Sequence, residues 1–348
     1  MRRWQADLAL VLVTVIWGST FVVVKNALNR VGPLVFVATR FWIAVALLAL
    51  LLLVRRPART DHLLRHGALT GLFLTLGFVT QTLGLRTTEA GQAAFITGLS
   101  VVLVPLLAAL VLRQPPSRAA IVGVVLATGG LALMTLDQEL RLASGDLWVL
   151  ACALAFALHI LSTGHFAPHH DVLAFTLVQL ATVALLASLG ALIFERTTLL
   201  LPSQALPAAL YIGVTATALV FVIQTWSQQY TTPTHTALIF ALEPVFAALF
   251  AAAFADERLD LRESSGAALI LLGMILAEVG EGLSRSRTSL SQNEACDPAR
   301  SAIRDQDLSA TRVTAWGCRR LMRDPSPRSG EAVQDDKRVV VLTARPDN

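Results

Sequence analysis

Residues 33–54 read PLVFVATRFWIAVALLALLLLV, an apolar run in which Arg40 is the only charged residue. An α-helix rises about 1.5 Å per residue, so a run of this length crosses the ~30 Å hydrocarbon core of a bilayer. Inside lipid, a segment must satisfy its own backbone hydrogen bonds, which favours a helix over an isolated strand. The run therefore predicts a transmembrane α-helix.

Similar apolar runs recur along most of the chain. The sequence is 55% hydrophobic and 15% charged, whereas soluble domains carry about 25% charged residues. Short breaks rich in Pro, Gly and Arg separate the runs, as at Gly32-Pro33 and Pro115-Pro116. The sequence predicts an all-α membrane protein with ten transmembrane helices, at residues 8–25, 33–54, 66–85, 90–112, 119–136, 146–165, 172–194, 206–226, 233–255 and 264–280.

The placement of basic residues orients these helices. With the N-terminus in the cytoplasm, the cytoplasmic segments of the first half carry eight arginines, and the outer segments carry four Lys and Arg residues. Cytoplasmic loops are the ones enriched in Lys and Arg. Ten helices then return the C-terminus to the cytoplasm. The richness in Ala, Leu and Arg is typical of a bacterium with GC-rich DNA, so we expect a multi-pass protein of the bacterial inner membrane.

An internal repeat appears when residues 86–130 are laid over residues 230–274 without gaps. The register aligns Thr87-Thr88 with Thr231-Thr232, Ala93 with Ala237, Arg118 with Arg262, and Gly129 with Gly273. A unit of five helices has an odd number of spans, so a second copy enters the membrane in the opposite sense. The sequence therefore predicts two inverted five-helix repeats, residues 1–137 and 145–282, which is an arrangement typical of transporters.

Residues 283–348 differ from the rest of the chain. They are rich in Ser, Arg, Asp and Pro, and they hold 12 Lys and Arg residues against 9 Asp and Glu residues. We expect a disordered, charged cytoplasmic tail. The excess of basic residues lies mostly in this tail, and no basic face with interleaved aromatic residues appears elsewhere. We therefore expect no nucleic-acid partner.

Several short motifs follow one another at characteristic spacings. They are Trp17-Gly18-Ser19-Thr20-Phe21, Lys25, Gly32-Pro33-Leu34, Ala38-Thr39-Arg40-Phe41, Leu242-Glu243-Pro244-Val245-Phe246-Ala247-Ala248-Leu249, Asp256-Glu257-Arg258-Leu259 and Gly266-Ala267-Ala268-Leu269-Ile270. In order and spacing they resemble EamA-type members of the drug/metabolite transporter superfamily. The resemblance implies ten helices in two inverted repeats, with helices one to four and six to nine around a central cavity and helices five and ten bracing it. It also implies transport by alternating access.

Three ionisable residues are candidates for function, because a charge at membrane depth costs about 2.5–3.5 kcal/mol. Arg40 is suited to a carboxylate or phosphate of the substrate; alternatively, it snorkels or binds carbonyl groups of neighbouring helices. Lys25 is suited to attracting anions at the outer mouth of the cavity; alternatively, it anchors a helix end. Glu243, beside Pro244, is suited to proton coupling or to binding an amine; alternatively, Arg40 neutralises it or it caps freed backbone groups.

Uncharged polar residues inside the spans complete the predicted site. Substrate binding is assigned to Gln81, Gln92, Gln179 and Gln224, with Trp17 and His159. The alternatives are hydrogen bonds between helices for the glutamines, packing for Trp17, and a buried neutral ring for His159. Pro105 and Pro244 are the predicted hinges.

No enzyme signature occurs in the sequence: HExxH, GxSxG, a Walker loop and GxGxxG are all missing. We therefore expect no enzymatic activity and no cofactor. His165, His169, His170 and Asp171 are metal-ligating residue types, but Pro168 lies among them in a loop that we expect to be flexible and solvated. No metal site is predicted.

These observations favour a secondary active transporter, in the direction of export, for small metabolites, amino acids or drug-like compounds. The expected mechanism is alternating access with proton coupling. The expected partners are a small-molecule substrate, the lipid bilayer, and a second copy of the chain that packs through helices five and ten. Two alternatives remain: a membrane-embedded scaffold or sensor subunit with a recruiting tail, and an intramembrane enzyme that uses Glu243 and His159 as an acid/base pair.

Overall fold

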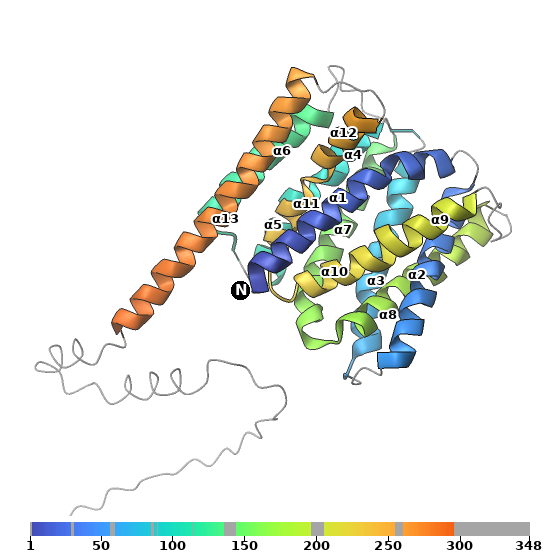
Figure 1. Ribbon diagram of the computed structural model, residues 1–348, viewed down its shortest axis with the longest axis horizontal. Coiled ribbons are helices and arrows are strands. Elements are labelled where there is room, and N and C mark those ends of the chain that lie inside the picture. Colours follow the sequence, from blue (N-terminus) through green and yellow to red (C-terminus); the bar gives the residue numbers. More distant parts are fainter. Residues whose placement is uncertain are drawn as a thin grey trace, which may run out of the picture. The chain divides into compact units, whose positions relative to one another are not determined.

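The computed structural model describes residues 2–28, 31–55, 60–84, 87–88, 90–113, 115–135, 144–195, 205–254 and 260–295 (Figure 1). Every regular element in these residues is helical, as the apolar runs predict, and no strand occurs among them. The chain groups into two compact units, Met1–Leu283 and Ser284–Asn348. All of the packing described below lies within the first unit.

The elements follow the order of the predicted spans. The first half consists of α1 (Arg2–Leu28), α2 (Pro33–Arg55), α3 (Leu63–Gly84), α4 (Ala90–Gly98), α5 (Ser100–Val111) and α6 (Arg118–Thr135). The second half consists of α7 (Asp146–Phe166), η1 (Ala167–His169), α8 (Val172–Gly190), η2 (Ala191–Glu195), α9 (Leu206–Gly213), η4 (Val214–Leu219), α10 (Val220–Ser227), α11 (Pro233–Phe240), α12 (Glu243–Phe254) and α13 (Leu261–Ala295).

Within the described part of the chain, six helical segments are long and apolar enough to cross a membrane: Pro33–Arg55, Leu63–Gly84, Asp146–His169, Val172–Glu195, Leu206–Ser227 and Pro233–Phe250. Two shorter apolar helices, Phe95–Val111 and Arg118–Met134, accompany them. Many large apolar side chains lie on the outside of the protein; Leu53 is 75% exposed and Val54 is 86% exposed. Apolar surface of this extent is typical of a protein in contact with lipid.

The span predicted at 233–255, with a hinge at Pro244, is divided into two helices. Helix α11 ends at Phe240, and α12 begins after a turn at Ala241 and Leu242. Pro244 is the cause, because it has no N–H to bond the carbonyl of Phe240 four residues earlier. The N–H of Leu242 donates to the carbonyl of Ile239 at 2.9 Å, which tightens the turn.

The span predicted at 90–112 is likewise divided, into α4 and α5. The break lies at Leu99, whose N–H is shared between the carbonyl groups of Phe95 (3.1 Å) and Ile96 (3.2 Å). Pro105 lies inside α5, more than a turn beyond this break. The divided spans occupy corresponding positions in the repeat register, so the two halves share an unusual feature.

The helix contacts also have the pattern expected of two related halves. Helix α1 contacts α10 and α12, and its counterpart in the second half, α7, contacts α3 and α5. Helix α2 contacts α9 and η4, and its counterpart α8 contacts α3. The span α9–η4–α10 corresponds to α3, and α11–α12 corresponds to α4–α5. Exchanging these spans for their counterparts therefore reproduces the contacts named here.

Helices α6 and α13 pack through glycines. A Cβ atom at Gly123 would lie 2.6 Å from the carbonyl oxygen of Gly273, and one at Gly266 would lie 2.6 Å from that of Gly130. Small residues let two helix backbones approach closely in a membrane. Gly129 does not take part, because a Cβ atom there would have nothing within 4 Å. The predicted homodimer through these two helices stays a prediction.

The last helix is longer than predicted. The sequence places the end of this span at 280 and a disordered tail from 283, but α13 continues to Ala295. Residues 283–295 contain no Pro or Gly to end the helix, which explains the difference. The remainder of the predicted tail, 296–348, lies outside the described residues.

Candidate functional site

Arg40 is a buried cation in the first half of α2, and its side chain is 8% exposed. Its Nε–H donates to Oγ1 of Thr217 at 3.1 Å. The guanidinium carbon lies 5.0 Å from the ring centroid of Phe78 and 5.3 Å from that of Phe41. No carboxylate of the described residues pairs with it. The two Nη atoms make no hydrogen bond to a described residue.

A π-helical segment presents Thr217 to Arg40. The segment η4 interrupts the span predicted as a regular helix at 206–226, and Oγ1 of Thr217 donates to the carbonyl of Ile212 at 3.0 Å. Gly213 allows the close approach of α2, because a Cβ atom there would lie 2.9 Å from the carbonyl oxygen of Arg40. π-Helical turns are frequent at functional sites. Sequence reasoning did not identify Thr217.

Six aromatic rings join Arg40 to the interior; we call Trp17, Phe41, Phe78, Phe156, Phe221 and Phe240 the aromatic cluster. Phe221 is central, with its ring centroid 6.0 Å from that of Trp17 and 6.1 Å from that of Phe41. Phe78 contacts Phe41 (5.3 Å) and Phe156 (5.6 Å), and Trp17 contacts Phe240 (5.1 Å). The indole N–H of Trp17 donates to the carbonyl of Ala216 at 3.2 Å, which fixes the orientation of the ring.

A buried polar cluster adjoins the aromatic cluster; it consists of His159, Gln179, Gln224 and Gln228, each at most 3% exposed. The Nε2–H of His159 donates to Oε1 of Gln179 at 3.1 Å. Nε2 of Gln224 donates to Oε1 of Gln228 at 3.2 Å, and Nε2 of Gln228 donates to the carbonyl of Ile160 at 2.9 Å. The ring of His159 lies 5.9 Å from that of Phe221, so the two clusters are in contact.

Two amide atoms of the polar cluster lack a hydrogen-bond partner among the described residues. They are Nε2 of Gln179, a donor, and Oε1 of Gln224, an acceptor. An unpaired buried polar group costs about 1–3 kcal/mol. A donor and an acceptor at this site are therefore suited to polar groups of a ligand or to water.

Glu243 is the first residue of α12, immediately after the break in its span, and it is half-buried. It makes no hydrogen bond or ion pair with a described residue, so Arg40 does not neutralise it. Gly18 lets α1 lie against this part of α12, because a Cβ atom at Gly18 would lie 2.8 Å from the backbone nitrogen of Ala247. Trp17 contacts Phe240 just before the break. Glu243 therefore belongs to the helix that packs against α1.

Some of the predicted site residues are connected by contacts in the structure, and others are not. Trp17, Arg40, His159, Gln179 and Gln224 belong to one connected set of contacts, as described above. Gln81 is half-buried in α3 and makes no hydrogen bond within the described part of the chain.

For two predicted site residues, the structure describes the backbone but not the side chain. The side chains of Lys25 and Gln92 lie outside the described residues, although their backbone is helical. Pro105 and Pro244 both lie in divided spans, but only Pro244 lies beside its break.

Two contacts that involve histidines connect the first repeat to the second. They lie at the N-terminal ends of α1, α3, α8 and α11. Nε2 of His235 lies 3.3 Å from Oδ1 of Asp7, which links α11 to α1. Nδ1 of His66 lies 2.9 Å from Nε2 of His170, which links α3 to the start of α8. The sequence analysis noted His170 but identified neither of these pairs. Their partners are distant along the chain and come from the other half.

Two further polar contacts cross between the repeats at the opposite helix ends. The carboxylate of Glu195, at the end of η2, accepts from the N–H groups of Leu34 (2.8 Å) and Val35 (3.1 Å) at the start of α2. A carboxylate at a helix N-terminus is favoured by the unpaired N–H groups there. Oγ1 of Thr88 donates to Asp146, the first residue of α7, at 2.9 Å.

His170 is more buried than expected for a histidine in a solvated loop. His170 is 7% exposed, and its Nδ1 lies 2.7 Å from Oγ1 of Thr60. The ring of His66 stacks on that of Phe166, with 4.2 Å between the ring centroids. The described residues contain no group of three or more His, Cys, Asp or Glu side chains arranged to hold a metal ion.

Acid pH should break the contact between His66 and His170. Burial, together with positive charge on the neighbouring histidines, lowers the pKa of His170 below its ordinary value. The neutral ring is therefore favoured in the folded protein. The contact stabilises the protein above pH ~6.5 and loses about 1 kcal/mol of stabilisation as the pH falls through the folded pKa, because two protonated rings cannot share a hydrogen bond.

Melting temperatures of the purified protein between pH 7.5 and pH 5 check this expectation. The wild type should lose more stability than His66→Gln over this range. A comparison variant, His169→Gln, alters an exposed histidine but keeps the contact between His66 and His170, so it should also lose more stability than His66→Gln. Equal pH dependence in all three proteins would contradict the assignment.

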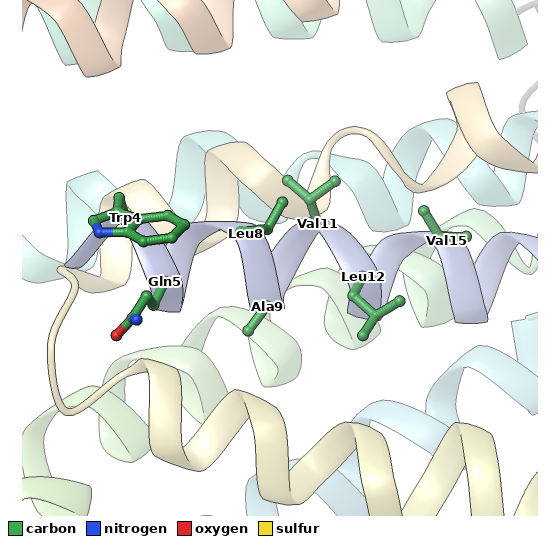
Figure 2. A pocket seen from close by; sticks show the side chains of 7 residues that line it. All are labelled: Trp4, Gln5, Leu8, Ala9, Val11, Leu12 and Val15. Atoms are coloured by element: carbon green, nitrogen blue, oxygen red, sulfur yellow. The ribbon is translucent and has the colours of Figure 1, made fainter. Parts of the chain in front are cut away.

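A surface hollow lies along the first half of α1 (Figure 2). Its lining consists of Trp4, Gln5, Leu8, Ala9, Val11, Leu12 and Val15. It carries no charge, and none of the predicted site residues lines it. Because Trp4 and Leu8 are also about 60% exposed, this hollow has the character of a lipid-facing groove rather than of a polar ligand site.

Comparisons with known proteins point to one family. The model of the EamA-like transporter family matches residues 4–136 and, a second time, residues 143–278. A protein of Archaeoglobus fulgidus called an uncharacterized transporter is 33% identical over 279 residues, which cover 80% of this chain and 87% of that protein. The uncharacterized transporter YoaV of Bacillus subtilis is 24% identical over 285 residues, which cover 77% of this chain and 95% of YoaV.

A solved structure has the same fold. It is titled only as the crystal structure of a protein, and it is 18% identical to this chain with a TM-score of 0.68. The match covers 79% of this chain and 98% of that chain. At this identity the likeness shows the fold alone.

Proposed function

The chain belongs to the EamA-like transporter family, and from this premise we propose that it is a secondary active transporter that exports small metabolites, amino acids or drug-like compounds. The chain is a multi-pass membrane protein with two repeats of the family. The proposal adds the substrate class, the direction and the mechanism.

One observation carries the proposal: Arg40, the aromatic cluster and the polar cluster form a continuous set of contacts at the junction of the two repeats. Arg40 comes from the first repeat and Thr217 from the second. Trp17 from the first repeat contacts Phe221 from the second, which contacts His159. Transporters with inverted repeats bind their substrates at such a junction, near the middle of the membrane.

We further propose that the two repeats cross a bacterial inner membrane with ten spans in opposite senses. The spans are α1, α2, α3, α4–α5 and α6 in the first repeat, and α7, α8–η2, α9–η4–α10, α11–α12 and α13 in the second. The exchange symmetry of the helix contacts supports this arrangement. The arginine distribution supports a cytoplasmic location for both termini.

In alternating access, the substrate site is open to one side of the membrane at a time. The contacts between the repeats on the two sides must therefore break alternately. Asp7–His235 and His66–His170 cross at one set of helix ends, which the proposed orientation places on the cytoplasmic side. Glu195 with the start of α2, and Thr88–Asp146, cross at the outer side. The divided spans α4–α5 and α11–α12 supply places where the backbone can bend.

Gradient-driven flux in proteoliposomes tests the proposed function. Purified full-length protein is first screened for stabilising ligands among amino acids, nucleosides, polyamines and antibiotics, since a ligand that binds the folded state raises its melting temperature. The best ligand is then used in flux assays. We expect flux that is saturable and responds to an imposed pH gradient. Conversion of the ligand to a product in detergent, without vesicles, would instead support an enzyme.

A further inference from the structure

We infer that the transported substrate is an organic anion with one carboxylate on a flat apolar body, and that Arg40 holds the carboxylate. The inference rests on the proposed function and specifies the ligand of that same site. It starts from the environment of one side chain, because Arg40 is 92% shielded and has no carboxylate partner in the described part of the chain.

The hydrogen bond to Thr217 leaves one edge of the guanidinium group available. Nε donates to Oγ1 of Thr217, and the pair formed by Nη1 and Nη2 has no hydrogen-bond partner among the described residues. This pair has the fork geometry that matches the two oxygens of a carboxylate or phosphate. Thr217 is itself held by its bond to the carbonyl of Ile212, so the direction of the fork is fixed before a ligand arrives.

Charge balance favours a singly charged anion. One buried guanidinium group is neutralised by one negative charge, whereas a phosphate monoester brings nearly two. No second described basic side chain pairs with Arg40 or contacts Phe41 or Phe78. A carboxylate therefore matches the site better than a phosphate monoester does.

The neighbourhood of Arg40 indicates the rest of the ligand. Phe41 and Phe78 lie beneath the guanidinium group, and the aromatic cluster extends from them to Trp17 and Phe240. Flat apolar groups pack well against such rings. The polar cluster contacts Phe221 through His159, and within it the Nε2 donor of Gln179 and the Oε1 acceptor of Gln224 have no partner among the described residues, so each is suited to a polar substituent of the ligand. An inside-negative membrane potential also favours the exit of an anion, in agreement with export.

Binding of matched ligands to the wild-type protein in nanodiscs tests the inference without mutation. The probes are phenylacetate, its neutral analogue phenylacetamide, the cation phenethylammonium, and phenyl phosphate, with acetate to test the need for the flat body. We expect phenylacetate to bind at least tenfold more tightly than every other probe. Equal or tighter binding of the amide, the cation or the phosphate would overturn the inference, and so would failure of phenylacetate to bind.

Variants then test whether the carboxylate of the ligand binds to Arg40. Arg40→Gln should weaken phenylacetate binding at least tenfold and leave phenylacetamide binding unchanged, and Arg40→Lys should restore part of the preference. Arg55→Gln is the matched control, because Arg55 lies at the exposed end of the same helix. Retained carboxylate preference in Arg40→Gln would overturn the assignment. Anion binding without any flux in proteoliposomes would count against the transporter proposal alone.

Discussion

Replacing Glu243 with glutamine should reduce flux driven by a pH gradient at least tenfold. Glu243 stands at the break between α11 and α12 and has no partner among the described residues. Glutamine has nearly the same shape but cannot take up a proton, so the variant should keep the fold and lose the coupling. Exchange of labelled for unlabelled ligand across the membrane, without a gradient, should persist.

Two further variants make this experiment specific. Glu243→Asp keeps a titratable group and should retain the response to the pH gradient. Glu263→Gln is the matched control, because Glu263 also lies in the first turn of a helix, where its carboxylate accepts from the N–H of Asp260 at 3.0 Å. Unchanged flux in Glu243→Gln at every pH would remove Glu243 from the coupling role.

Replacing Gly130 with alanine should destabilise the protein by about 1–3 kcal/mol, which is the usual cost of overpacking a close contact. The added Cβ atom would overlap the backbone of Gly266, and backbone atoms can move aside only if the helices separate. Thermal unfolding of the purified protein in detergent, followed by intrinsic fluorescence, measures the change.

The next residue along the chain provides the control. A Cβ atom at Gly129 would have nothing within 4 Å. Gly129→Ala should be neutral or slightly stabilising, because alanine favours a helix by about 1 kcal/mol over glycine. If both variants lowered the melting temperature equally, the close packing of α6 against α13 would not be the cause.

The hydrophobic pattern was sufficient to predict the helices, because a bilayer requires long apolar segments and permits few charges within them. Arg40 and Glu243 stood out for the same reason, and the structure gives neither of them an ion-pair partner among the described residues. The motif around Pro244 also indicated a bend, and the helix does break there.

Other features could not be predicted from one sequence. The break at Leu99 has no adjacent proline, and the π-helical segment that holds Thr217 contains no Pro or Gly that would mark it in the sequence. Hydrogen bonds such as His66–His170 join residues more than a hundred positions apart, so no local pattern reveals them. Gln81 was predicted to bind substrate because it is a glutamine within a span, like Gln179 and Gln224. The structure gives it no hydrogen bond in the described part of the chain.

Labelling of single cysteines from outside intact cells tests most directly whether the two repeats are inverted. Ser117 and Leu261 are equivalent in the repeat register, at the starts of α6 and α13. In a background without Cys152, Cys296 and Cys318, a membrane-impermeant maleimide should label Leu261→Cys in intact cells and Ser117→Cys only after lysis. Labelling of both positions from the same side would contradict the inverted arrangement, and with it the proposed alternating access.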